Sequence, residues 1–387
     1  MSLNVFASYG GVGGYQILTE RLLSAFRRAP ASSPVHDPNI FSIDGSTSRH
    51  TPTRRDQGLT NSGTKPVQEI SLGILPIGRA LSFHGATHVL YPAHEGTLLT
   101  RAEVRNLNEM DQVWVSSRHS YKVFQDMGVS KDRLRLFPCF IDADHFRPLV
   151  SSRLTHGMHL PTYRMLTGKG PSPECPLRFL VVGKYEKRKA TREAVEAFLR
   201  VAEEHPLREA LSLTLKLSTS VHSRSTRLIK EDLLDLLRDY PKAASRIHLL
   251  DQTETDLLAL YNSVDCLLMP SRAEGNGLPL LESMACALPT VVTGYTSLGM
   301  YVTEETNVVL PDRGTIKALD PFFHITPHNF GSWGEVLVED IEGALKRIIE
   351  MDNHERYQLG QQARKRIQLF SYQSATDRAT AFIQELQ

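Results

Sequence analysis

Apolar positions along the first third of the chain switch repeatedly between a strand-like period of two and a helix-like period near 3.6. Short apolar runs typical of buried strands occur at residues 3–8, 87–91, 112–117 and 133–137. Helical spacing of apolar residues follows the first and third of these runs, at residues 15–26 and 118–127. Gly128 ends the second of these predicted helices. Strand, helix and strand with short connections are typical of parallel βαβ units.

The same alternation restarts after residues 148–176, a stretch with five prolines, three glycines and no sustained period. That stretch is predicted to be a linker. Further strands are predicted at 177–183, 211–217, 263–270 and 289–294, and residues 335–386 are predicted to be mostly helical. The pattern therefore indicates two doubly wound α/β domains, with ligands expected where strand carboxyl ends face a cleft.

Composition narrows the class of protein. The 387 residues carry 44 Lys and Arg against 43 Asp and Glu, a net charge of +1, which argues against a dedicated nucleic-acid-binding protein. No apolar run is long enough to span a membrane, and the N-terminus lacks the pattern of a signal peptide. The cysteines are widely spaced, which predicts reduced thiols in a cytoplasmic protein, and no spacing predicts a metal site. They are Cys139, Cys175, Cys266 and Cys286.

Residues 45–66 are polar and carry the basic side chains Arg49, His50, Arg54 and Arg55. One interpretation is an ordinary surface loop. The other is a basic lid that contacts an anionic acceptor or the headgroups of a membrane surface.

The stretch 267–294 carries the clearest chemistry. A buried strand ends near Pro270, and Pro279 suits the start of a short helix. Gly275 and Gly277 lie between these two prolines and let the backbone approach a ligand closely. The start of the helix offers N–H groups that have no partner within the helix. Glu274 and Glu282 flank the glycines, and carboxylates accept hydrogen bonds from polyols. The alternatives are an exposed loop charge for Glu274 and a first-turn carboxylate favoured by the helix dipole for Glu282.

This stretch, EGNGLPLLESMACALP, resembles the motif of retaining glycosyltransferase family 4, which has the GT-B fold. The motif has two glutamates separated by seven residues. Ser283 and Ala287 replace the usual Ala and Gly, and Asn276 replaces an apolar or aromatic residue. The resemblance implies that Glu274 contacts the donor sugar and Glu282 the nucleotide ribose. The intervening residues would complete the donor site: Gly275, Asn276, Gly277 and Leu278.

Other motifs extend the resemblance. Residues 181–198 resemble the family's strand and basic turn, which implies that Lys184 and Lys189 hold the donor diphosphate, with Arg188 as a competing residue. A solvated basic turn is the alternative. Residues 9–16 resemble the glycine loop of the first domain, which assigns Gly11 and Gly13 to donor binding. A nicotinamide-binding interpretation of this loop is weak, because Gln16 stands where the third glycine would be.

His94 matches a histidine that the family places beside the reacting sugar, and Glu95 is nearly as good a match. A loop histidine bonded to the backbone is the alternative. The assigned catalytic residues are therefore Glu274, His94 and Lys189. No metal and no cofactor are expected beyond the co-substrate, a UDP- or GDP-sugar.

The resemblance implies two Rossmann-like domains: an acceptor domain at 1–160 and a donor-nucleotide domain at 161–370. A C-terminal helix at 371–387 is expected to cross back to the first domain. The implied activity is retaining transfer of a hexose to an acceptor hydroxyl. Two alternatives stay open: an epimerase or phosphorylase on the same scaffold, or a non-catalytic sugar-nucleotide-binding protein. The expected location is the cytoplasm, with peripheral membrane contact through residues 49–55.

Overall fold

The computed structural model describes most of the chain, and the chain divides into two compact units. The described residues are 3–7, 14–42, 70–80, 86–149, 163–165, 177–206, 208–217, 223–250, 256–320 and 325–387. The first unit comprises Met1–Asp142, Pro327–Gly331 and Leu369–Gln387, and the second comprises Ala143–Thr326 and Ser332–Gln368. The first unit is therefore built from three separate segments of the chain.

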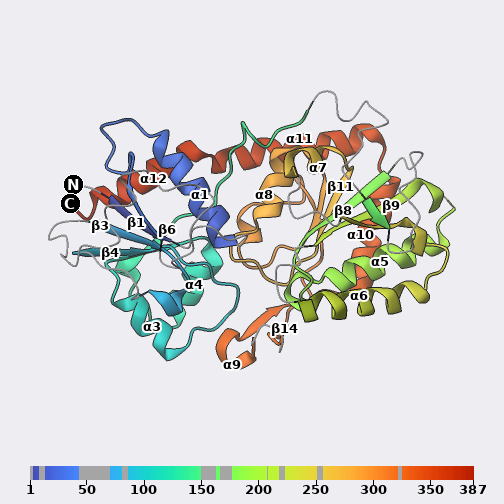
Figure 1. Ribbon diagram of the computed structural model, residues 1–387, viewed down its shortest axis with the longest axis horizontal. Coiled ribbons are helices and arrows are strands. Elements are labelled where there is room, and N and C mark those ends of the chain that lie inside the picture. The colour runs from blue at the N-terminus through green and yellow to red at the C-terminus, as the bar shows by residue number, and fades with distance from the viewer. Residues whose placement is uncertain are drawn as a thin grey trace. The chain divides into compact units, whose positions relative to one another are not determined.

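The first unit contains a six-stranded parallel sheet with the order β2-β1-β3-β4-β5-β6. Its strands are β1 (Leu3–Ala7), β2 (Asn39–Ser42), β3 (Ile70–Ile74), β4 (Thr87–Leu90), β5 (Gln112–Val115) and β6 (Leu134–Leu136). Its helices are α1 (Gly14–Arg27), α3 (Arg101–Asn108), α4 (Arg118–Asp126), α9 (Pro327–Phe330) and α12 (Tyr372–Gln384). Helices α1 and α12 pack together on one face of the sheet, and α3 and α4 cover the other (Figure 1).

The second unit contains a seven-stranded sheet with the order β13-β12-β11-β8-β9-β10-β7. The strands are β7 (Tyr163–Met165), β8 (Leu177–Gly183), β9 (Leu211–Leu217), β10 (Ile247–Leu250), β11 (Cys266–Met269), β12 (Thr290–Val292) and β13 (Val308–Val309). All neighbouring pairs are parallel except β7 with β10. A separate two-stranded antiparallel ribbon joins β14 (Thr315–Lys317) to β15 (Ser332–Gly334).

Strand β7 lies inside residues 148–176, for which the sequence pattern predicted a linker and no strand. That prediction was wrong for these three residues, because β7 pairs with β10 at the edge of the sheet. Three residues are too few to display a period of two, so the strand depends on a partner that is distant in sequence.

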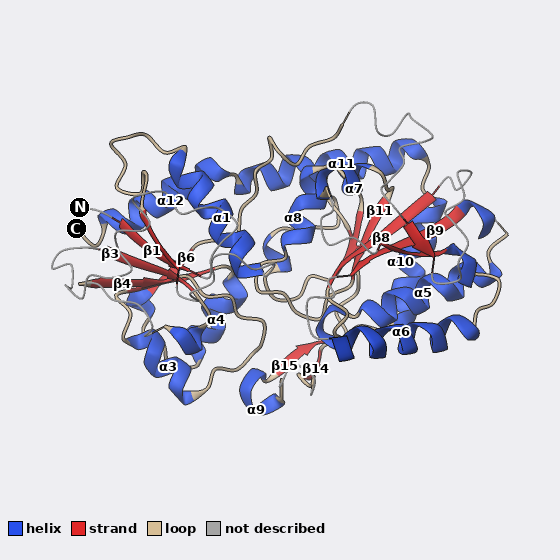
Figure 2. Cartoon of the chain, in the orientation of Figure 1, coloured by secondary structure: helices blue, strands red, loops and turns tan. Residues whose placement is uncertain are grey.

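Helices cover both faces of the second sheet: α5, α6 and α10 lie on one face, and α7, α8 and α11 on the other (Figure 2). They are α5 (Thr191–Glu204), α6 (Ser223–Arg238), α7 (Leu257–Asn262), α8 (Leu278–Ala285), α10 (Val338–Glu350) and α11 (Asn353–Ile367). Short 3₁₀ turns include η3 (Lys187–Lys189) and η6 (Leu298–Met300).

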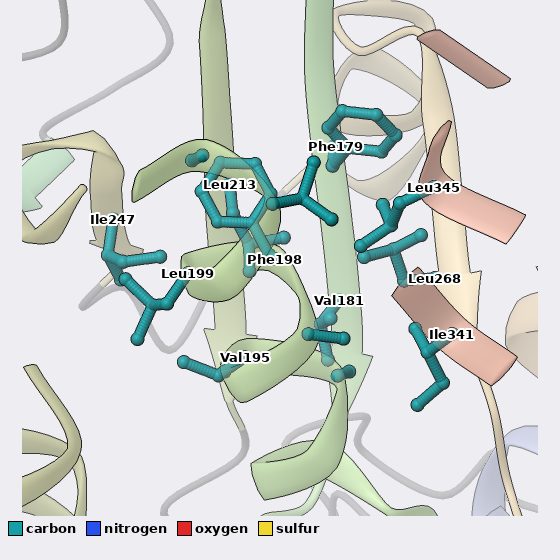
Figure 3. Packing of buried hydrophobic residues seen from close by; sticks show 14 of the residues in the cluster. Phe179, Val181, Val195, Phe198, Leu199, Leu213, Ile247, Leu268, Ile341 and Leu345 are labelled. Atoms are coloured by element: carbon teal, nitrogen blue, oxygen red, sulfur yellow. The ribbon is translucent and has the colours of Figure 1, made fainter. Parts of the chain in front are cut away.

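The core of the second unit explains why α5 packs on this sheet. Phe179 on β8 and Phe198 on α5 meet edge to face, with ring centroids 5.9 Å apart, beside Leu213 of β9 (Figure 3). Leu345 of α10 packs against the same sheet, so the apolar stripes of α5 and α10 share one core. No helix in the described parts of the chain has the length and apolar character needed to cross a bilayer.

Candidate functional site

Glu274 lies in the loop between β11 and α8, and a second loop holds its backbone. Its N–H donates to Thr296 Oγ1 at 2.7 Å, and its carbonyl accepts from the Thr296 hydroxyl at 3.0 Å. The Ser297 N–H donates to the same carbonyl at 3.3 Å. Only 4% of Glu274 is exposed, so its carboxylate is a buried charge rather than the exposed loop charge of the alternative interpretation.

Two cations from the turn after β8 contact that carboxylate. Lys189 Nζ lies 2.5 Å from Glu274 Oε1, and Arg188 Nη1 lies 3.3 Å from Oε2. Arg188 also donates to the Ala273 carbonyl at 2.7 Å and to Glu186 at 2.6 Å. Arg188 therefore ties the two loops together, whereas the Lys189 ammonium bonds only Glu274 among the described residues.

These cations decide the ionisation of Glu274. Burial by itself would raise the pKa of its carboxyl, but the charges of Lys189 and Arg188 outweigh that effect and hold the pKa below the ordinary value. Glu274 is therefore a carboxylate at neutral pH. A buried anion next to an ammonium can accept from hydroxyl groups while the ammonium donates to an anion.

The start of α8 requires glycine at position 277. Gly277 is the residue before the helix and has φ 69°, in the left-handed region. A Cβ added there would also lie 2.6 Å from Leu298 Cδ2 of η6. Next to it, Asn276 Oδ1 and Ser297 Oγ are buried without a hydrogen-bond partner in the described residues. The loop thus keeps polar atoms available at the amino end of α8.

Glu282 is fixed by a tyrosine of the neighbouring helix. The Tyr261 hydroxyl of α7 donates to Glu282 Oε2 at 2.7 Å, and only 3% of Glu282 is exposed. The sequence placed Glu282 in the first turn of its helix. That was wrong, since α8 begins at Leu278 and its first turn contains no acidic residue. The helix-dipole alternative therefore loses its basis, and the hydrogen bond with Tyr261 accounts for the buried carboxylate.

Three residues of this region were missed by sequence reasoning: Tyr261, Arg272 and Thr296. Arg272 Nη2 donates to Glu193 at 2.8 Å, and its guanidinium also reaches the Lys187 carbonyl. Arg272 could have been found from the sequence, because a cation stands only two residues before Glu274. Lys184 is partly exposed, and its carbonyl accepts from the Thr191 hydroxyl at 3.2 Å, which links it to the first turn of α5.

His94 lies in the first unit, in the loop after β4. It is 5% exposed, and its Nε2 has no hydrogen-bond partner among the described residues. Burial, with a smaller effect from His119, lowers the pKa of His94 to about 4, so the imidazole is neutral at pH 7. The preceding Ala93 N–H donates to the Tyr15 hydroxyl of α1 at 2.9 Å, which fixes the start of this loop.

The assignments of Gly11 and Gly13, and the basic segment at 45–66, lie outside the described residues. Among the described residues, no three His, Cys, Asp or Glu side chains gather in a metal-binding group.

The chain is similar in sequence and in structure to known proteins. Residues 176–319 match a family model described as glycosyl transferases group 1. D-inositol 3-phosphate glycosyltransferase from Acidothermus cellulolyticus is 28% identical over 200 residues, which are 51% of this chain. The match spans 41% of that relative's length.

Solved structures resemble the chain over nearly its whole length at low identity. Sucrose-phosphate synthase from Thermosynechococcus elongatus gives a TM-score of 0.68 at 16% identity, covering 100% of this chain and 99% of that one. Anabaena HepE in complex with UDP and glucose gives 0.68 at 13%, covering 99% of each. The UDP-forming trehalose-phosphate synthase from Burkholderia xenovorans gives 0.70 at 11%, covering 99% and 100%. The fold is therefore GT-B, with two Rossmann-like domains, and the second of these contains the segment that is similar to glycosyl transferases group 1.

Proposed function

We propose that the chain is a retaining glycosyltransferase of family 4 that transfers a hexose from a nucleotide-diphosphate sugar to an acceptor hydroxyl. The observation that carries the proposal is the buried contact between Glu274 and Lys189 beside the glycine-containing start of α8. Relatives with this fold have been solved with UDP and glucose, which favours a nucleotide-sugar donor.

Lys189 is the proposed ligand of the donor diphosphate. An ammonium group has three N–H donors, so Lys189 can keep its contact with Glu274 and still donate to a phosphate oxygen. Arg188 already bridges Ala273, Glu186 and Glu274, which favours a structural role for its guanidinium. A fixed cation at this position would stabilise the negative charge that develops on the leaving nucleotide.

Glu274 is the proposed partner of the donor sugar, and Glu282, held by Tyr261, of the nucleotide ribose. Because Glu274 stays ionised, it can accept hydrogen bonds from hydroxyls but cannot donate a proton to a leaving group at neutral pH. We therefore propose attack by the acceptor on the leaving-group face of the sugar. A phosphate oxygen of the donor would take the acceptor's proton, with retention of anomeric configuration.

The test compares Glu274→Gln and Lys189→Met with Lys187→Met, which removes an exposed charge from the same turn. Candidate donors are UDP-glucose and GDP-mannose, ranked first by the rise in melting temperature of the wild-type protein. With the best donor, Glu274→Gln and Lys189→Met should each lower turnover by about 10²-fold or more, and Lys187→Met by no more than about threefold.

Equal losses in all three variants would contradict the proposal, and so would unchanged turnover in Glu274→Gln. Binding of the donor without transfer or hydrolysis would indicate a non-catalytic binding protein instead. Proton NMR of the product gives the anomeric configuration, and inversion would rule out the retaining mechanism.

A further inference from the structure

A short segment between β14 and β15 belongs to the first unit, although the chain on both sides belongs to the second. This segment is Pro327–Gly331, and it contains the single turn of α9. Its backbone is bonded to the His94 loop, because the Thr97 N–H donates to the Phe330 carbonyl at 2.9 Å. This hydrogen bond holds the segment against the loop that carries His94.

Glycines on both sides make this contact close. A Cβ added at Gly96 would lie 2.2 Å from the Phe330 carbonyl oxygen. Gly331 has φ 74°, and a Cβ there would lie 2.4 Å from Thr97 Oγ1. Neither position tolerates a side chain while the contact holds, so the two loops fit only because both residues are glycine.

The Phe330 ring stacks with the His94 imidazole. The rings are nearly parallel, with an interplanar angle of 10° and centroids 6.2 Å apart. Phe124 of α4 meets the same imidazole at 65°, with centroids 5.5 Å apart. Two hydrocarbon rings exclude water from the imidazole, and the loss of hydration favours its neutral form.

The hydrogen bonding defines what the neutral ring can do. An interaction with the backbone of Gly96 opposes the effect of burial and favours the protonated form of the His94 imidazole. Nε2 is buried and has no hydrogen-bond partner in the described residues. In the neutral ring with its proton on Nδ1, Nε2 offers a lone pair. A buried acceptor without a partner is costly and suits a ligand that brings a hydroxyl.

We propose that Phe330 is a positioning residue for His94: its ring fixes the imidazole and keeps Nε2 an uncharged acceptor for a hydroxyl of the donor sugar. The identity of that hydroxyl rests on the proposed function, whereas the positioning of His94 by Phe330 does not. The titratable group that acts on His94 from the packed elements is His119 of α4, whose Nε2 lies 3.1 Å from the Gly96 carbonyl.

The experiment follows the His94 imidazole by NMR during a pH titration of the full chain. The variants are Phe330→Ala and Phe330→Tyr, which keeps a flat ring, with His328→Ala as the exposed control on the same turn. The midpoint of His94 should rise by about one unit or more in Phe330→Ala, toward 6.5, and stay near the wild-type value in the other two. A His119→Gln background removes the other titratable group and should keep this difference.

An unchanged His94 midpoint in folded Phe330→Ala overturns the proposal, and so does an equal rise in Phe330→Tyr. If Phe330→Ala does not fold, Phe330→Leu takes its place, and the same outcomes apply. The acid limb of the pH profile of kcat/KM should move with the midpoint, and Phe330→Tyr should restore it. A shifted midpoint with an unchanged profile would keep the positioning role but remove His94 from the proposed transfer reaction.

Discussion

A single alanine at the end of α8 adopts a backbone conformation that normally favours glycine. Ala287 has φ 54°, and two backbone bonds close the helix around it: Ala287 N–H to Met284 O at 3.0 Å and Leu288 N–H to Ser283 O at 2.9 Å. This pair of bonds is the Schellman motif, whose left-handed residue is usually Gly. The family motif has Gly at this place, so the sequence departure has a backbone cost that the motif alone did not reveal.

Replacing Ala287 by Gly should therefore be neutral or slightly stabilising, by up to about 0.5 kcal/mol. Relief of about 1–2 kcal/mol of left-handed strain is mostly offset by the flexibility of unfolded glycine and the lost methyl burial. The matched control is Ala285→Gly, two residues earlier in the helix, which should cost about 1 kcal/mol or more. Urea unfolding measures both. A loss in Ala287→Gly as large as in the control would contradict this explanation.

The hydroxyl of Tyr261 should matter for both stability and donor binding. Tyr261→Phe removes the hydrogen bond to the buried Glu282 carboxylate, and bonds to charged groups contribute about 1.5–3 kcal/mol. We expect a loss of this size in thermal or urea unfolding and weaker binding of the nucleotide in calorimetry. Tyr357→Phe, on the exposed surface of α11, is the control and should change neither. Unaltered stability in Tyr261→Phe would show that other groups satisfy Glu282.

At the scale of elements, α11 lies against the end of α8 through a glycine. Gly360 of α11 is buried, and a Cβ added there would lie 2.0 Å from the Ala287 carbonyl oxygen, a backbone atom. Gly343 of α10 is also a helical glycine, but it is exposed and a Cβ there would meet nothing within 4 Å. The two glycines differ in packing rather than in secondary structure.

Replacing each of these two glycines by alanine should change the free energy of unfolding in opposite directions. Gly343→Ala should stabilise the second unit by about 0.5–1 kcal/mol, because alanine favours helix more than glycine does. Gly360→Ala gains the same propensity but forces α11 away from α8, and we expect a net loss of about 1–3 kcal/mol. Chemical unfolding of the two variants checks this. Stabilisation by both would mean that α11 adjusts without cost.

Elements with strong local patterns were predicted well, and elements that depend on distant partners were not. The strands at 177–183 and 211–217 are confirmed with the same bounds. The first is a mostly apolar run that suits burial in a parallel sheet, and the second alternates Leu with polar residues at a period of two. The short strands β2, β3 and β10 were not predicted. In the structure β2 and β3 both pair in register with β1, and β10 pairs with β9. Their formation requires a sheet edge supplied from elsewhere in the chain.

On the scale of the whole molecule, each unit contains a buried histidine that should make it sensitive to acid. Burial lowers the pKa of His94 to about 4, with a smaller effect of His119, and burial with the charge of Arg246 lowers the pKa of His248 to about 4. Unfolded histidine titrates near 6.5, so between these values the unfolded state binds more protons. Stability is therefore fully present above about pH 6.5 and is lost as the pH falls toward 4.

Each histidine should contribute about 2 kcal/mol of stability loss between pH 7 and pH 5. The two tryptophans, Trp114 in the first unit and Trp333 in the second, are both buried and report on each unit separately in Trp→Phe variants. His94→Gln should flatten the pH dependence seen by Trp114 only, and His248→Gln that seen by Trp333 only. If the stability reported by Trp333 depends on pH as steeply in His248→Gln as in the wild type, the role of His248 is contradicted.

The sequence by itself determined the alternation of strands and helices, the glycine-containing loop at 274–278 and the residue types available for binding. These follow from local periodicity and from backbone requirements such as that of Gly277, which neighbouring residues reveal. Tertiary structure decided which of these residues meet. Lys189 and Glu274 are 85 positions apart, and they meet because β8 and β11 are adjacent in the parallel sheet and their carboxyl ends lie at one edge. The Phe330 ring on His94 has no signal in the sequence at all, because stacking depends on a long-range contact that periodicity does not encode.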